Sequence, residues 1–138
     1  MKGILADANI TGPIESLVHQ MQSGTWVEFW TALGLQFKRF DDLGLSPDAS
    51  DFTVWQTCQS EHLILITANR NKKSADSLEE TILQYNQPDS LPVFTISNME
   101  AFGASRTYAE KVLEHLYDYL LRIDEFRGTG RLYLPQKQ

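Results

Sequence analysis

The fold of this chain is decided by the stretch His62-Leu63-Ile64-Leu65-Ile66-Thr67. Four large aliphatic residues follow one another there without interruption, and the polar segment Ala68 to Ser74 comes directly after the threonine. A strand that is buried on both faces has this composition, and such strands belong in the middle of parallel sheets. We therefore predict a central strand at residues 62–67 and a polar turn after it.

Further strands are predicted elsewhere in the chain. Residues 2–9 begin with the apolar run Gly3-Ile4-Leu5-Ala6 and end in Asp7-Ala8-Asn9, which indicates a second buried strand. Residues 92–96 have a similar apolar character, so we predict a strand there too. The weak alternation of residues 35–40 indicates an edge strand, and residues 41–49 are expected to form a loop.

Amphipathic helices are predicted between these strands, because apolar residues recur there at intervals of three and four positions. Residues that favour or cap a first helical turn mark their starts, namely Pro13, Ser50, Ser77 and Thr107. A short helix over residues 26–33 should stop at Gly34, and residues 127–131 should be a flexible turn. The alternating order predicts an α/β fold with a three-layer, mostly parallel central sheet and helices on both faces.

The composition indicates one soluble domain. A chain of 138 residues with 42% hydrophobic and 22% charged residues can build one core, so we treat residues 1–138 as a single domain. The single cysteine, Cys58, cannot form an internal disulfide. No apolar run has the length of a membrane span, and no signal peptide is evident. The sequence therefore predicts a cytoplasmic protein that does not enter a membrane.

The net charge of −6 excludes a broad basic surface for nucleic acid. Binding of phosphates would have to be local. Basic residues gather in three places, which are Lys38 with Arg39, Arg70 with Lys72 and Lys73, and Arg127 with Arg131. We interpret such clusters first as solvated surface, with local phosphate contact as the alternative.

Two predicted strand ends are rich in polar residues. Ligands of parallel sheets bind beyond the carboxyl ends of the strands, near the point where the strand order reverses. If both strands are central, their ends lie side by side, and one pocket would then hold Asp7, Asn9, Thr67, Asn69 and Asn71, with Asp51 at its rim. Such oxygen ligands suit Mg²⁺ or Mn²⁺. The alternative is that these residues only cap helices and turns.

In this arrangement the sequence resembles the PIN-like domains, especially the short stand-alone bacterial group related to the ribonucleases of toxin–antitoxin pairs. Three motifs carry the resemblance: Ile4 to Asn9, which ends in Asp-x-Asn; Leu45 to Asp51, which opens a helix; and Leu63 to Asn71, where the family has Thr-x-Asp-x-Asp. The motifs cover residues 1 to about 75, and the later elements follow in a compatible order.

The resemblance implies a ribonuclease that depends on Mg²⁺ or Mn²⁺, with RNA as substrate and an antitoxin-like protein as partner. Asp7 would be the principal metal ligand and Asp51 the second acid, while Asn9 would support the site through hydrogen bonds. Thr67 would orient neighbouring groups or phosphate. The chain departs from the pattern at Asn69 and Asn71, whose amides bring no charge to a cation site and cannot act as a general base.

Charged residues just downstream could act at this altered site in different ways. Asp76, with Glu79, could replace the missing acids as a metal ligand, or both could simply favour the start of their own helix. Arg70, Lys72 and Lys73 would hold RNA phosphates beside a metal, or an anion without one.

Three hypotheses therefore stand at this point. The first is a metal-dependent ribonuclease with Asp7 and Asp51 as its catalytic acids, and the second is a PIN-like binding or regulatory module that no longer cleaves. The third, a receiver-like phosphoacceptor domain, is disfavoured because Asp7-Ala8-Asn9 lacks the expected acidic pair. Trp26 and Trp30 lie one helical turn apart and make core packing or a homodimer contact more plausible than base stacking.

Overall fold

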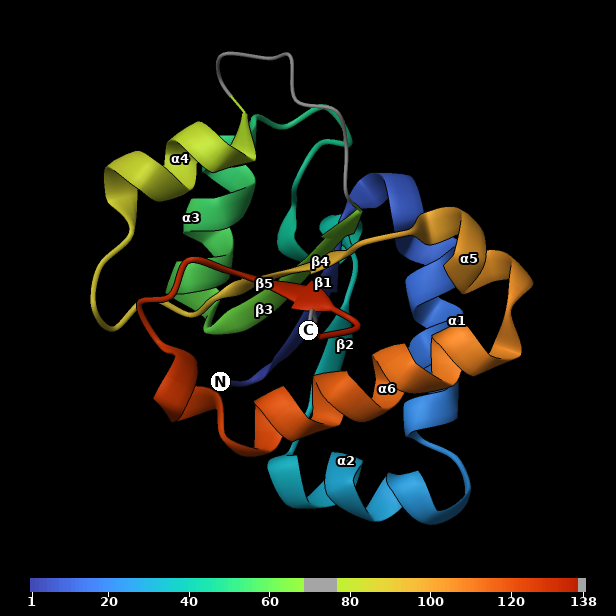
Figure 1. Ribbon diagram of the computed structural model, residues 1–138. Helices are drawn as coiled ribbons and strands as arrows, with labels where there is room; N and C mark the ends of the chain where they lie inside the picture. Colours follow the sequence, from blue (N-terminus) through green and yellow to red (C-terminus); the bar gives the residue numbers. More distant parts are fainter. Residues whose placement is uncertain (69–76, 137–138) are drawn as a thin grey trace.

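The computed structural model describes residues 1–68 and 77–136. At its centre lies a sheet of five strands that all run parallel, in the order β2-β1-β3-β4-β5 (Figure 1). The strands are β1 (Gly3–Ala6), β2 (Gln36–Lys38), β3 (Leu63–Ala68), β4 (Val93–Ile96) and β5 (Arg131–Leu134). The predictions of a central strand at residues 62–67 and of an edge strand within residues 35–40 are confirmed.

Helices cover both faces of this sheet, which confirms the predicted three-layer α/β architecture (Figure 1). They are α1 (Thr11–Met21), α2 (Val27–Leu33), α3 (Asp51–Glu61), α4 (Leu78–Tyr85), α5 (Met99–Ala104) and α6 (Arg106–Leu121). Short 3-10 turns lie at η1 (Ala8–Ile10), η2 (Gly24–Trp26), η3 (Phe40–Leu43) and η4 (Ile123–Phe126). The loop predicted for residues 41–49 thus begins inside a 3-10 turn.

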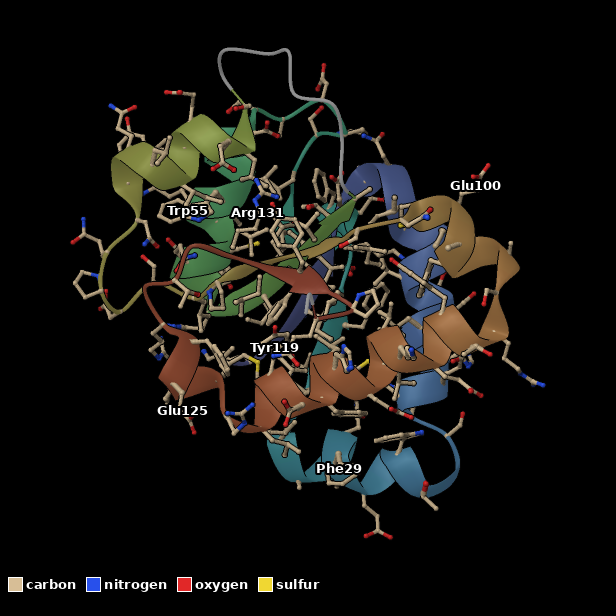
Figure 2. All side chains as sticks on the ribbon, viewed as in Figure 1. Phe29, Trp55, Glu100, Tyr119, Glu125 and Arg131 are labelled. Atoms are coloured by element: carbon tan, nitrogen blue, oxygen red, sulfur yellow. The ribbon has the colours of Figure 1, made fainter. Side chains whose placement is uncertain are left out.

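Alternation along the strands divides the interior into two cores. One set of strand side chains packs against α1 and α6, and it comprises Ile4, Ala6, Ile64, Ile66, Phe94, Ile96 and Leu134. The other set packs against α3 and α4, and it comprises Leu5, Leu63, Leu65 and Val93. On the first face, Tyr119 of α6 places its ring 5.4 Å from that of Phe94 (Figure 2). The two apolar faces explain why the central strands are apolar at every position.

The last third of the chain differs from the sequence prediction in three places. Helix α6 begins at Arg106 rather than in a capping box at Thr107, because the extended residue Ser105 accepts a hydrogen bond from the Tyr108 N–H at 3.1 Å. Helix α5, capped by Asn98, was not predicted. Residues 127–131 do contain a turn, with positive φ at Gly128 and Gly130, but strand β5 already starts at Arg131.

The connection from β4 to β5 has an unusual hand. The crossovers from β2 to β3 and from β3 to β4 step toward one edge of the sheet and carry α3 and α4 on one face (Figure 1). The crossover from β4 to β5 steps the same way, but its helices α5 and α6 pack on the face of α1. It is therefore left-handed, whereas about 98% of such connections are right-handed. This connection brings no helix to the α3 side of β5.

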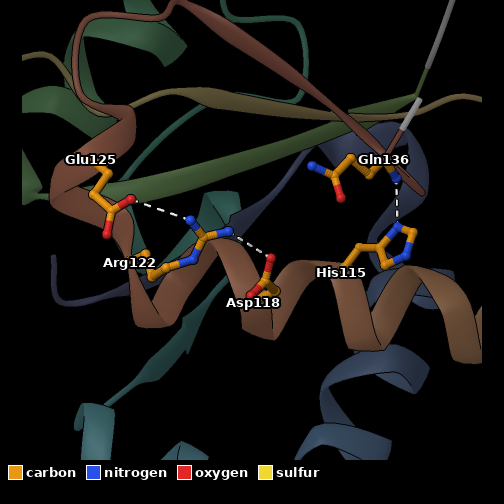
Figure 3. Close-up of polar contacts among 5 residues, drawn as sticks. All are labelled: His115, Asp118, Arg122, Glu125 and Gln136. Atoms are coloured by element: carbon orange, nitrogen blue, oxygen red, sulfur yellow. Dashed lines mark hydrogen bonds and ion pairs between the residues drawn. The ribbon is translucent and has the colours of Figure 1, made fainter. Parts of the chain in front are cut away.

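The chain end after β5 is tied back to α6. The backbone N–H of Gln136 donates a hydrogen bond of 2.6 Å to Nδ1 of His115 (Figure 3). At the C-terminal end of α6, Arg122 forms ion pairs of 2.8 Å with Asp118 of the helix and 3.2 Å with Glu125 of η4 (Figure 3). The Gln136 contact thus connects the segment after β5 to α6.

A buried tyrosine links α6 to the end of α1. The Tyr117 hydroxyl donates to the carbonyl oxygen of Met21 at 2.7 Å, and its ring stacks on Trp26 at 5.4 Å. Burial raises the pKa of Tyr117 from its usual 10.0 to about 12. We expect Tyr117→Phe to lower the free energy of unfolding by about 1 kcal/mol, measured by urea denaturation at neutral pH.

The same variant makes a pH-dependent prediction. Because the pKa of Tyr117 is higher in the folded chain than in the unfolded chain, the folded state binds more protons between pH 10 and about 12. Stability of the wild type should fall as the pH rises through this window, and the fall should be shallower for Tyr117→Phe. Cys58, whose pKa burial also raises to about 12, contributes equally to both proteins. Identical pH profiles would contradict this account.

Candidate functional site

The ends of β1 and β3 lie side by side, as the sequence predicts. Ala6 is in register with Ile66, and the Asp7 N–H donates a hydrogen bond of 3.0 Å to the Ile66 carbonyl oxygen. Asp7 is therefore the direct neighbour of Thr67 on the adjacent strand. The strand order also reverses here, since the chain passes from β1 to one side and resumes at β3 on the other. Ligands of doubly wound sheets bind at such a point.

Asp7 and Thr67 belong to a longer set of polar residues. Thr67 is in register with Thr95, and Thr95 is in register with Tyr133. Neighbouring strands lie about 4.8 Å apart, so these residues form a line across the carboxyl edge of the sheet. We call Asp7, Thr67, Thr95 and Tyr133 the polar row. Ile66 and Leu134 point to the face of the sheet that α1 and α6 cover. Side chains alternate along a strand, so those of the polar row point to the opposite face, which carries α3 and α4.

The two threonines of the polar row are buried and bonded to each other. Thr67 is 4% exposed and Thr95 is 1% exposed, and their hydroxyl oxygens lie 3.2 Å apart. Arg131 Nη1 donates to the Thr95 hydroxyl oxygen at 2.5 Å. Buried hydroxyls need such partners, because an unmade hydrogen bond in the interior is costly. The contacts fix the hydroxyls in one arrangement next to Asp7.

Arg131 is a site residue that the sequence interpretation missed. Its side chain is only 18% exposed and pairs with Glu79, whose carboxylate oxygen lies 3.2 Å from Nη2. Figure 2 shows Arg131 directed from β5 toward the face on which Trp55 and α3 lie. The interpretation of Arg127 and Arg131 as solvated surface is therefore wrong for Arg131. The alternation of polar and apolar residues over 131–134 could have indicated this strand and its polar face.

Glu79 interacts both with the start of its own helix and with a distant arginine. It lies in the first turn of α4, where an acidic side chain is stabilised by the helix dipole, as the sequence predicted. Its carboxylate is also the partner of Arg131, which the sequence did not predict. Glu79 thus connects α4 to the edge strand β5.

Asp51 lies at the same edge of the sheet as Asp7. Helix α3 follows β2 and precedes β3, so it must begin near the carboxyl ends of the strands. Ser50 caps this helix by accepting a hydrogen bond of 3.1 Å from the Thr53 N–H, which places Asp51 in the first turn. The structure therefore places Asp7 next to Thr67, and Asp51 at the same edge of the sheet.

The contact between Asp7 and Asn9 is made by the backbone of Asn9. The Asn9 backbone N–H, not its exposed side chain, donates to Asp7 Oδ1 at 3.2 Å. Asp7 thereby caps the 3-10 turn η1. The capping role considered for strand-end aspartates is thus confirmed for Asp7. The same contact fixes the orientation of the carboxylate at the site.

Several predicted site residues lie outside the described residues, namely Asn69, Arg70, Asn71, Lys72, Lys73 and Asp76. Within residues 1–68 and 77–136, no three His, Cys, Asp or Glu side chains cluster closely enough to form a metal centre. Asp7 and Asp51 are oxygen donors, and Mg²⁺ is commonly held by one or two carboxylates together with water and substrate phosphate. Asp7 and Asp51 are thus the described carboxylates at this edge that could take part in holding such a cation.

The Thr95 hydroxyl should stabilise the fold through its hydrogen bonds to Thr67 and Arg131. Thr95→Val keeps the shape of the side chain but leaves Thr67 and Arg131 without this partner, so we expect a loss of about 2 kcal/mol or more in unfolding free energy. The matched variant Thr95→Ser keeps the hydroxyl and loses one methyl group, worth about 1 kcal/mol. Urea denaturation compares the two. A Thr95→Val protein at least as stable as Thr95→Ser would show that these hydrogen bonds do not stabilise the row.

The chain was also compared with known proteins. No protein-family model, curated protein or solved structure matches it. Among the helices of the described segments, none is both long and apolar enough to cross a membrane. The function of the site has to be inferred from the polar row, from Arg131 and from the sequence motifs.

Proposed function

We propose that this protein is a PIN-like, metal-dependent ribonuclease whose site lies at the carboxyl edge of the sheet. The observation that carries the proposal is the position of Asp7 beside Thr67 at the point where the strand order reverses. Asp51 begins a helix at the same edge. The order of these three residues follows the PIN-like pattern that the sequence resembles, in which strand-end acids handle phosphodiesters.

The residues of the chain have distinct roles in this proposal. Asp7 and Asp51 would hold Mg²⁺ or Mn²⁺, with Asp76 as the third candidate ligand. When bound, such a cation orients a water molecule and the phosphodiester for hydrolysis. The Asp7 carboxylate is kept in place by the strand pairing and by the Asn9 N–H. The Thr67 hydroxyl is kept in place by Thr95 and helps to position phosphate next to Asp7.

A second candidate is a PIN-like module that binds RNA without cleaving it. The specific observation in its favour is that Asn69 and Asn71 stand where the family pattern has aspartates. Amide oxygens bring no negative charge, so cation affinity should fall. Arg70, Lys72 and Lys73 follow in the sequence and would favour phosphate. The strand order is also found in receiver domains, so it does not by itself separate the PIN-like from the receiver-like hypothesis.

Three predictions about partners and location accompany this function. They are binding of an antitoxin-like protein, formation of a homodimer and a cytoplasmic location. Trp26 stacks on Tyr117 at 5.4 Å, which uses its ring in packing. Val27 and Phe29 of the following helix, α2, are 37% and 38% exposed, so α2 presents apolar side chains at the surface. That surface is the one we propose for contact with a protein partner.

The nuclease proposal predicts that Asp7 is indispensable. Asp7→Asn removes one negative charge from the proposed cation site and should lower Mn²⁺ affinity and reduce RNA cleavage by about 100-fold or more. Isothermal titration with Mn²⁺ and cleavage of labelled RNA measure the two effects. Asp118→Asn is the matched control, because it removes the same charge from an exposed carboxylate of α6 that pairs with Arg122.

Three outcomes separate the candidates. Cleavage by the wild type and by Asp118→Asn, but not by Asp7→Asn, supports the ribonuclease. Retention of RNA without cleavage, at any Mn²⁺ concentration, favours the binding module. Absence of both metal and RNA binding would show that the proposal is wrong. Asn69→Asp should raise Mn²⁺ affinity if the site keeps the geometry of the family pattern.

A further inference from the structure

Arg131 presents a hydrogen-bonding edge that is only half used. A guanidinium group offers Nε–H and Nη2–H as a parallel pair, which matches two oxygens of a carboxylate or phosphate. In this protein Nη2 lies 3.2 Å from one oxygen of Glu79. Within the part of the chain that the structure describes, Nε is buried and donates to no acceptor. Glu79 therefore satisfies one of the two donors on this edge.

The opposite edge of the same guanidinium is anchored. Arg131 Nη1 donates to the Thr95 hydroxyl at 2.5 Å, and Thr95 is bonded to Thr67 at 3.2 Å. The side chain is 18% exposed, so it has little freedom to move. A guanidinium that is fixed on one edge and has an unpaired Nε on the other is preorganised for a planar pair of oxygens, because little rotamer freedom is lost when it binds them.

Glu79 is a weak occupant of that edge. Its side chain is 58% exposed and reaches Arg131 from the first turn of α4. The Glu79 end of this ion pair is solvated, so its carboxylate can turn to water, and an anion that takes its place keeps the charge of Arg131 compensated. The left-handed crossover to β5 places α5 and α6 on the other face of the sheet. The helix next to Arg131 is therefore α4, whose Glu79 pairs with it and whose Ile82 lies close to Gly130.

We propose that the Nε–Nη2 edge of Arg131 is a phosphate-binding site for the RNA backbone, and that Glu79 occupies it when no RNA is bound. On binding, two phosphate oxygens accept hydrogen bonds from Nε and Nη2, and the Glu79 carboxylate turns to solvent. Nη1 stays on Thr95. The idea rests on the proposed phosphodiester substrate, and it adds a second contact point, next to Thr95 of the polar row.

The placement of the two points suits a nucleic-acid strand. Asp7 lies next to Thr67, and Arg131 is bonded to Thr95, so the two threonine hydroxyls separate them along the sheet edge. One phosphate at Asp7 and another at Arg131 would align the strand across β1, β3, β4 and β5. Phosphate contacts of this kind position a strand without reading its sequence.

The decisive experiment uses inorganic phosphate and the metal-free full-length protein. Glu79→Gln removes the competing charge, and we expect it to raise phosphate affinity roughly three- to tenfold over the wild type, followed by NMR shifts of backbone amides. Arg131→Lys keeps the charge but loses the paired donors, and should weaken binding about tenfold. The matched control is Glu125→Gln, because Glu125 is 61% exposed and lies 3.2 Å from Arg122 on another face.

Two results would overturn the inference. One is a phosphate affinity that is the same in Glu79→Gln and Glu125→Gln, and the other is no shift in any variant at tens of millimolar phosphate. Glu79→Gln changes an exposed helical side chain, so the test does not depend on whether Arg131→Lys folds. RNA cleavage with Mn²⁺ is scored separately. A phosphate response without cleavage contradicts the ribonuclease and leaves the Arg131 site standing, whereas cleavage without a Glu79 effect contradicts only the site.

Discussion

The parallel pairing of β1 with β3 is the constraint on which the rest of the structure depends. These strands are buried on both faces, so their register is set by two apolar cores at once. A shift by one residue would turn Ile4, Ile64 and Ile66 toward the wrong helices. Because the pairing cannot slip, the residue after each strand has a fixed neighbour, and Asp7 meets Thr67. The chemistry of the site follows from this packing.

The hand of the last crossover determines how the polar row is completed. Had the helices between β4 and β5 packed beside α4, they would have covered the face that carries Thr95 and Arg131. They pack beside α1 instead, and β5 contributes Arg131 and Tyr133 to the α3 side of the sheet. On that side, the partly buried guanidinium of Arg131 is bonded to the buried hydroxyl of Thr95. The left-handed connection thus concerns the β5 part of the polar row, namely Tyr133 and the neighbouring Arg131.

The sequence predicted those parts of the fold that depend on local pattern. The aliphatic run at residues 62–67 and the run before Asp7 could only be buried strands, and their juxtaposition followed from parallel pairing. Arg131 was missed because Gly128 and Gly130, shortly before it, favour a turn, and because its partners Thr95 and Glu79 are distant in sequence. The start of α6 was misplaced by two residues, since Ser105 and Thr107 are both good caps and only the backbone decides between them. The roles of Asn69, Asn71 and Asp76 lie outside the described residues.

The central claim is that RNA binds at the carboxyl edge of the sheet, across the polar row. Mapping of backbone amide shifts on adding a short RNA that resists cleavage tests this most directly. The account predicts that the largest shifts lie at Asp7, Thr67, Thr95 and residues 131–133, with small shifts on α2 and α6. Shifts concentrated on α2 or α6, or none at the carboxyl edge, would contradict it.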